Sequence, residues 1–155
     1  MPSLTQVSAE PSSRHTAKVA PLDRVWMRSA GWLPDAAVLK VDVQGFELKL
    51  LRGARRFLTQ GRVRCVAFEV AAAWLKAQGA SPDDLHDELT AAGFDHFIRL
   101  DVSCAARFRP CTIEFVRIGR SKLSEADGEY VACGAEAARR LWRGKHRSPT
   151  QWRFR

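Results

Sequence analysis

The chain has 155 residues, enough for one domain with tails, and its 46% hydrophobic content is normal for a globular protein. Its formal net charge of +8 comes almost entirely from residues 139–155, which contain seven Lys and Arg residues and no acid. The basic character therefore belongs to the tail and indicates little about the folded body. No stretch has the apolar length of a signal peptide or a membrane span, so the body is expected to be soluble and, by default, cytoplasmic.

The four cysteines, at positions 65, 104, 111 and 133, form no Cys-x-x-Cys pair, and no histidines cluster at zinc-ligand spacing. This pattern predicts no metal site. Cys65 lies in an apolar run and is interpreted as a small buried apolar side chain. Cys104 and Cys111 flank an expected loop and could form a disulfide in an oxidising compartment, although reduced thiols are the favoured interpretation.

The amino-terminal part of the chain changes character near residue 17. Residues 1–16 are rich in Ser, Thr and Pro without periodicity, which predicts a disordered leader. A first ordered element is expected from Ala17, with a short helix that includes Leu22, Asp23 and Trp26 and stops around Gly31.

The clearest pattern follows. The run AVLKVDVQG is rich in β-branched residues and ends at Gly45, which predicts a strand and a turn. Phe46, Leu50 and Ala54 then recur at helical spacing, and Gly61 stands where a helix would end. A second strand is expected over residues 63–70.

The remaining elements complete an α/β pattern. A helix is expected over residues 83–93, and residues 96–100 and 112–119 predict two strands of a terminal hairpin. The order of elements indicates a mostly parallel sheet that ends in an antiparallel hairpin. The expected organisation is a leader (1–16), a folded domain (17–119) and a polar, then basic, extension (120–155) that contains a short helix around residues 135–142.

Charged residues interrupt the two central strands. Lys40 and Asp42 lie two apart, so they share one face of the first strand, and Glu69 is the only charge in CVAFEV. If the two strands are parallel neighbours, Asp42 and Glu69 rim one crevice at the carboxyl ends, where open α/β sheets bind ligands. Glu47 is expected near the same rim.

Structural interpretations of these charges stay open. Lys40 and Asp42 could form a structural ion pair, and Glu69 could anchor a helix amino terminus. Glu47 in the first turn of a helix favours the helix dipole whatever the function. Gly45 is interpreted as a backbone requirement, either a positive φ or a close approach between strand and helix.

The block LKVDVQGFELKLLRGARRFL, followed by VAFEV, resembles the signature of the FkbM family of methyltransferases. The resemblance covers about residues 17–119. It implies a class I (Rossmann-like) methyltransferase sheet that uses S-adenosyl-L-methionine and usually methylates an oxygen of a small molecule or sugar. It also implies catalytic roles for Asp42, Lys40 and Glu69, cofactor contacts from Asp42, Gln44 and Gly45, and substrate contacts from Glu47 and Glu69.

Two features depart from the family pattern. Gln44 stands where a glutamate is usual, and an amide cannot act as a base. The sequence also has no Gly-x-Gly turn, so only the carboxyl-terminal half of the domain is expected, inactive alone. Its first strand would then be an exposed edge that pairs with a complementing amino-terminal half or with another copy.

A second function class is kept as an alternative. The segments RRLWRGKHR and QWRFR interleave arginine with Trp142, Trp152 and Phe154. Arginine attracts phosphates and aromatic rings stack on bases. The tail could therefore make the chain a non-catalytic module that binds nucleic acid or another anionic surface.

Overall fold

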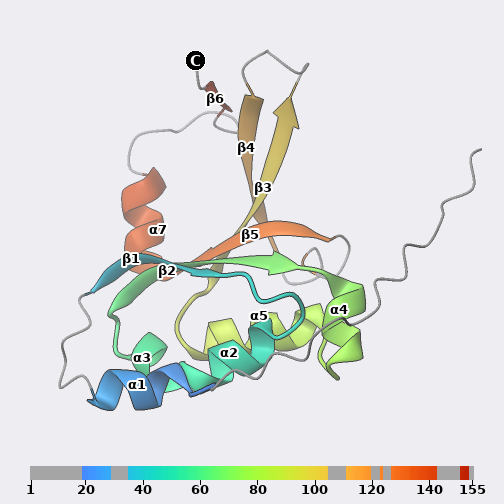
Figure 1. Cartoon of the computed structure of the whole chain (residues 1–155). Coiled ribbons are helices and arrows are strands. Elements are labelled where there is room, and N and C mark those ends of the chain that lie inside the picture. The colour runs from blue at the N-terminus through green and yellow to red at the C-terminus, as the bar shows by residue number, and fades with distance from the viewer. Residues whose placement is uncertain are drawn as a thin grey trace, which may run out of the picture.

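The computed structural model describes residues 19–28, 35–104, 111–119, 123, 127–142 and 151–153. Its strands form one six-stranded sheet in the order β1-β2-β5-β3-β4-β6 (Figure 1). The strands are β1 (Ala36–Val41), β2 (Val63–Val70), β3 (His96–Cys104), β4 (Cys111–Ile118), β5 (Gly128–Cys133) and β6 (Gln151–Arg153). The leader expected over residues 1–16 and most of the basic tail lie outside the described residues.

The helices form a layer on one face of the sheet, and α7 packs on the other side (Figure 1). They are α1 (Leu22–Arg28), α2 (Glu47–Gly53), α3 (Arg55–Thr59), α4 (Ala72–Ala77), α5 (Pro82–Ala91) and α7 (Ala135–Trp142). The main core lies between the sheet and the helical layer. There Val66, Phe68 and Val70 of β2 are fully buried in one cluster with Leu85 and Leu89 of α5.

The prediction of a mostly parallel sheet is wrong. Only β1 and β2 pair in parallel, whereas the other pairings are all antiparallel. The reason is β5, which runs antiparallel to both of its neighbours, β2 and β3, and so separates two strands that run in the same direction. The expected hairpin is confirmed, because β3 and β4 pair antiparallel from Phe97–Ile118 to Cys104–Cys111. It is not terminal, since β5 and β6 follow it in the chain and belong to the same sheet.

β5 comes from the segment that was expected to be a polar extension. Its Tyr130 and Ala132 are fully buried, and the Tyr130 ring stacks on Phe68 of β2 with 5.9 Å between the centroids. A strand in the middle of the sheet belongs to the folded unit. The domain therefore continues past residue 119 and includes β5 and α7.

The helix expected after Gly45 is broken into α2 and α3 at Ala54. Asp23 of α1 caps the new helix start, because its carboxylate accepts the backbone N–H groups of Arg56 at 2.9 Å and Phe57 at 2.8 Å. A side chain at Gly53 would come within 3.5 Å of Pro21. Gly53 therefore packs closely against the segment that leads into α1.

Cys65 and Cys133 form a disulfide across β2 and β5, where the two residues are directly opposite each other. Cys65 is buried, as expected, but it is not the free thiol that its apolar surroundings indicated. The cystine packs against Ala138 of α7 and so helps to hold this helix on the sheet. Cys104 and Cys111 face each other in the backbone register of β3 and β4, and their side chains lie outside the described part.

Candidate functional site

Asp42 and Glu69 lie next to each other at the ends of the parallel strands β1 and β2. The last paired residues of β1 and β2 are Val41 and Phe68, so Asp42 and Glu69 are the next residues along the two strands. The expected parallel pairing is confirmed. Both carboxylates therefore stand at the carboxyl ends of adjacent strands, on the sheet face that Lys40 shares.

Lys40 and Asp42 form an ion pair with 3.2 Å between Nζ and Oδ2. The hydrogen bond and the negative charge of Asp42 raise the pKa of Lys40. Both side chains are well exposed, at 61% and 46%. An exposed pair of this kind contributes little to stability, so these groups are accessible to a ligand rather than locked into the core.

Glu69 lies directly opposite Glu129 in the register of β2 and β5. Loss of hydration raises the pKa of Glu69 most, followed by the negative charges of Glu129 and Asp42. Lys40, Asp42, Glu69 and Glu129 thus form a patch in which three carboxylates surround one ammonium group, so the net charge of the patch is negative. Glu129 was missed from the sequence because β5 was not predicted, although the alternation in GEYVAC was a usable signal.

The turn that follows β1 has an unusual backbone. Gln44 has a φ of 48° and Gly45 a φ of 98°, both in the left-handed region. A Cβ at Gly45 would lie 2.8 Å from the carbonyl oxygen of Trp74 in α4. Both interpretations offered for Gly45 hold, because the position combines positive φ with a close backbone approach. The side chain of Gln44 is exposed beside this turn.

Glu47 is only 2% exposed. Its carboxylate accepts the backbone N–H of Gly45 at 2.9 Å and that of Val43 at 3.2 Å. It therefore holds the turn closed from the first residue of α2. The predicted substrate contact from Glu47 has no direct support in this geometry.

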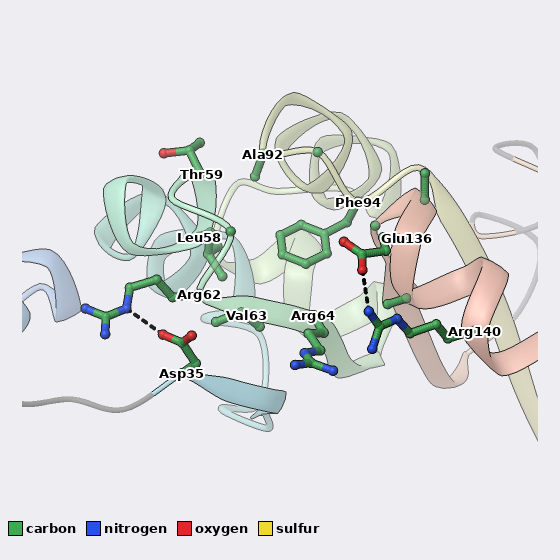
Figure 2. A pocket seen from close by; sticks show the side chains of 15 residues that line it. Asp35, Leu58, Thr59, Arg62, Val63, Arg64, Ala92, Phe94, Glu136 and Arg140 are labelled. Carbon is green, nitrogen blue, oxygen red and sulfur yellow. Dashed lines mark hydrogen bonds and ion pairs between the residues drawn. The ribbon is translucent and has the colours of Figure 1, made fainter.

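Three further observations concern metal ligands, the position of a cleft and membrane-spanning helices. Among the described residues, no group of three or more His, Cys, Asp or Glu side chains is arranged to hold a metal ion. The cleft drawn in Figure 2 lies at the opposite, amino ends of β1 and β2, so Asp42 and Glu69 do not line it. In the part of the chain that the structure describes, no helix is long and apolar enough to cross a membrane.

Comparison with known proteins supplies the family. The model of the methyltransferase FkbM domain matches residues 2–95, more than half of the chain. The match contains Lys40, Asp42, Gln44, Gly45 and Glu69, and it ends before β3, so Glu129 lies beyond it. Neither the curated proteins nor the solved structures yield a match. The chain belongs to the FkbM family of methyltransferase domains.

Proposed function

We propose that the protein takes part in methyl transfer to an oxygen of a small molecule or sugar, at the patch formed by Lys40, Asp42 and Glu69. Membership of the FkbM family supports a methyltransferase-like function. The observation that carries the location is the parallel pairing of β1 and β2, which brings the two carboxylates to adjacent strand ends. Ligands of open α/β sheets bind at this edge.

Asp42 is the proposed base or orienting group for the acceptor hydroxyl. Its carboxylate is half exposed and is bound on one side by the ammonium group of Lys40 at 3.2 Å. The ion pair fixes the direction of the carboxylate and leaves its other oxygen free to accept a proton or a hydrogen bond. Lys40 is therefore a positioning residue in this proposal.

Glu69 is proposed to hold a second polar group of the acceptor. Lost hydration, then the negative charge of Glu129 directly across the strand pair, raise the pKa of Glu69. Its carboxylate oxygens accept hydrogen bonds, which suits the hydroxyl groups of a sugar or another small-molecule acceptor.

The family implies S-adenosyl-L-methionine as methyl donor. The charges of the patch suit the cationic end of this molecule. The excess of carboxylates suits its cationic sulfonium and amino groups. The N–H groups of Val43 and Gly45 are already bound by Glu47, so Asp42 and the exposed side chain of Gln44 would make the contacts beside the Gly45 turn. When bound, this cofactor supplies an activated methyl group, so that the protein mainly aligns and deprotonates the acceptor.

The adenosine part of the cofactor requires contacts beyond this patch. β1 has only β2 as a neighbour within the described residues, and its outer edge carries unpaired backbone groups. We propose that a further strand, from a complementing segment or a second copy, pairs with this edge and completes the cofactor site. The described part alone is then expected to bind the cofactor weakly and to be inactive.

A titration of the labelled protein with S-adenosyl-L-methionine, followed by backbone amide NMR, tests the location because it detects weak binding. The expected result is a set of saturable shifts confined to residues 42–46 and 69–72. Asp42→Asn should weaken binding by about tenfold, the loss typical of a charge-assisted contact. Asp83→Asn removes an exposed aspartate from α5 and should leave the affinity for S-adenosyl-L-methionine unchanged. Shifts elsewhere, or equal binding by the two variants, would contradict the proposal.

A further inference from the structure

A cleft of about 440 Å³ lies at the amino ends of β1 and β2 (Figure 2). Its walls are the turn from α3 into β2, the turn from α5 into β3, and the start of α7. Since Asp42 and Glu69 stand at the other end of the same two strands, the cleft is separate from the proposed methyl-transfer patch. Its volume falls in the range of clefts that hold small organic molecules.

Three arginines line this cleft, and two of them are engaged. Arg62 pairs with Asp35 at 2.9 Å, and Arg140 pairs with Glu136 at 2.8 Å. Figure 2 shows Arg64 between these two pairs. Within the described residues, no hydrogen bond or ion pair occupies its exposed guanidinium group. Three cations and two paired acids leave the cleft with one positive charge, located at Arg64.

The backbone adds donors on the side of α7. The first N–H groups of a helix have no partner within the helix, and the first residues of α7, Ala135 to Ala137, line the cleft. The N–H of Gly134 is used, because it donates to the carbonyl oxygen of Arg64 at 3.2 Å. This bond holds the backbone of Arg64 against the start of α7. Arg64 and the first residues of α7 line the same cleft.

Small residues keep these donors accessible. The lining includes Ala92, Gly93, Gly134, Ala135 and Ala137. A Cβ at Gly134 would lie 3.4 Å from the carbonyl oxygen of Gly93, so the backbones of these two lining residues approach closely. The short side chains of this part of the lining cover little of the backbone at the start of α7.

We propose that this cleft binds a phosphate group, either free or carried by a small organic molecule. A phosphate dianion matches the planar fork of the Arg64 guanidinium and accepts several backbone N–H bonds at once. Arg62 and Arg140 border the same space, but their charges are balanced by Asp35 and Glu136, so Arg64 carries the attraction for the anion. The proposal does not depend on methyl transfer, because none of these residues belongs to the patch around Asp42.

Amide NMR titrations of the full chain with inorganic phosphate, glucose 6-phosphate and glucose test this site. Saturable shifts at Gly93 and at residues 134–137 are expected with both phosphates and not with glucose. Tighter binding of glucose 6-phosphate would assign an organic phosphate, and equal binding would assign the free anion. Arg64→Gln should weaken binding by about tenfold or more, and Arg64→Lys, which keeps the charge, should weaken it less.

Arg117→Gln is the matched control, since Arg117 is an exposed arginine on β4 outside the cleft. It should bind phosphate as the unchanged protein does. The proposal is overturned if neither phosphate shifts residues 134–137, if Arg117→Gln weakens binding as much as Arg64→Gln, or if glucose alone produces the same shifts.

Discussion

Glu69 on β2 faces Glu129 on β5 across an antiparallel strand pair. Like charges at directly opposite positions destabilise a sheet, and the pKa of Glu69 is raised by lost hydration and then by Glu129. The unfavourable contact lies between two inner strands of the sheet, near the strand ends that carry the proposed site. Such local costs are common at functional sites.

This contact gives a prediction with a defined pH dependence. Because the folded-state pKa of Glu69 lies above the unfolded value, ionisation of Glu69 costs folding free energy as pH rises through the folded pKa. Glu129→Gln should therefore stabilise the protein at neutral pH by roughly 0.2–1 kcal/mol, and the gain should shrink in acid as Glu69 takes up its proton. Urea unfolding at several pH values measures this. Asp83→Asn, in the first turn of α5, should instead lower stability.

Gly45 should tolerate no side chain. Gly45→Ala forces a Cβ to 2.8 Å from the Trp74 carbonyl and also places alanine at a φ of 98°. Gly61→Ala is the control, because Gly61 has a φ of 70° with nothing within 4 Å. The control should cost about 1–2 kcal/mol from the backbone alone. Gly45→Ala should cost clearly more in urea unfolding, and equal losses would show that the contact with Trp74 is unimportant.

The cap that Asp23 provides for α3 should be measurable. Asp23→Ala leaves the N–H groups of Arg56 and Phe57 without their acceptor and should cost about 1 kcal/mol, within the usual range for a lost cap. Asp35→Ala removes an exposed aspartate, 73% accessible, whose only described partner is Arg62; its cost should be near zero. A thermal unfolding comparison that ranks the two variants the other way would refute the capping role.

The disulfide between Cys65 and Cys133 closes a segment of 68 residues. In the chain-entropy account, such a loop contributes about 4 kcal/mol of stability. Replacement of both cysteines by alanine should lower the urea midpoint strongly. A reductant should destabilise the unchanged protein by a similar amount and leave the double variant unaffected. A reductant-insensitive midpoint in the unchanged protein would mean that the bond does not form in solution.

The outer edge of β1 should govern association. Val38 is 55% exposed on this edge strand, and a lysine on an edge discourages further strand pairing. If another strand pairs there, Val38→Lys should reduce self-association in sedimentation velocity experiments. Val19→Lys, at an even more exposed apolar position (92%) outside the strands, should not. Unchanged association in both variants would contradict the edge-pairing proposal.

Local patterns predicted the elements whose signals are contained in a few neighbouring residues. Charges in otherwise apolar strands singled out Lys40, Asp42 and Glu69 as candidates. The helix expected over residues 83–93 is present as Pro82–Ala91, where a Ser81–Asp84 capping box sets its start. The break at Ala54 depends on contacts from Pro21 and Asp23, more than thirty residues away in the chain. No window around the helix contains that information.

The same limit explains the missed strand. β5 is a strand because its backbone pairs with both β2 and β3 and because Tyr130 and Ala132 are buried in the core. Helix α4 was missed because its six residues are too few to show a period. Glu129 therefore could not be assigned to the site until the long-range pairing was known.

The position of β5 has a consequence for how the molecule is made. During synthesis, β2 and β3 leave the ribosome without the strand that must lie between them, since residues 128–133 follow both. Until that strand is inserted, each of its neighbours exposes an open edge to other nascent chains. The two half-sheets can therefore join into one sheet only after translation has passed Cys133.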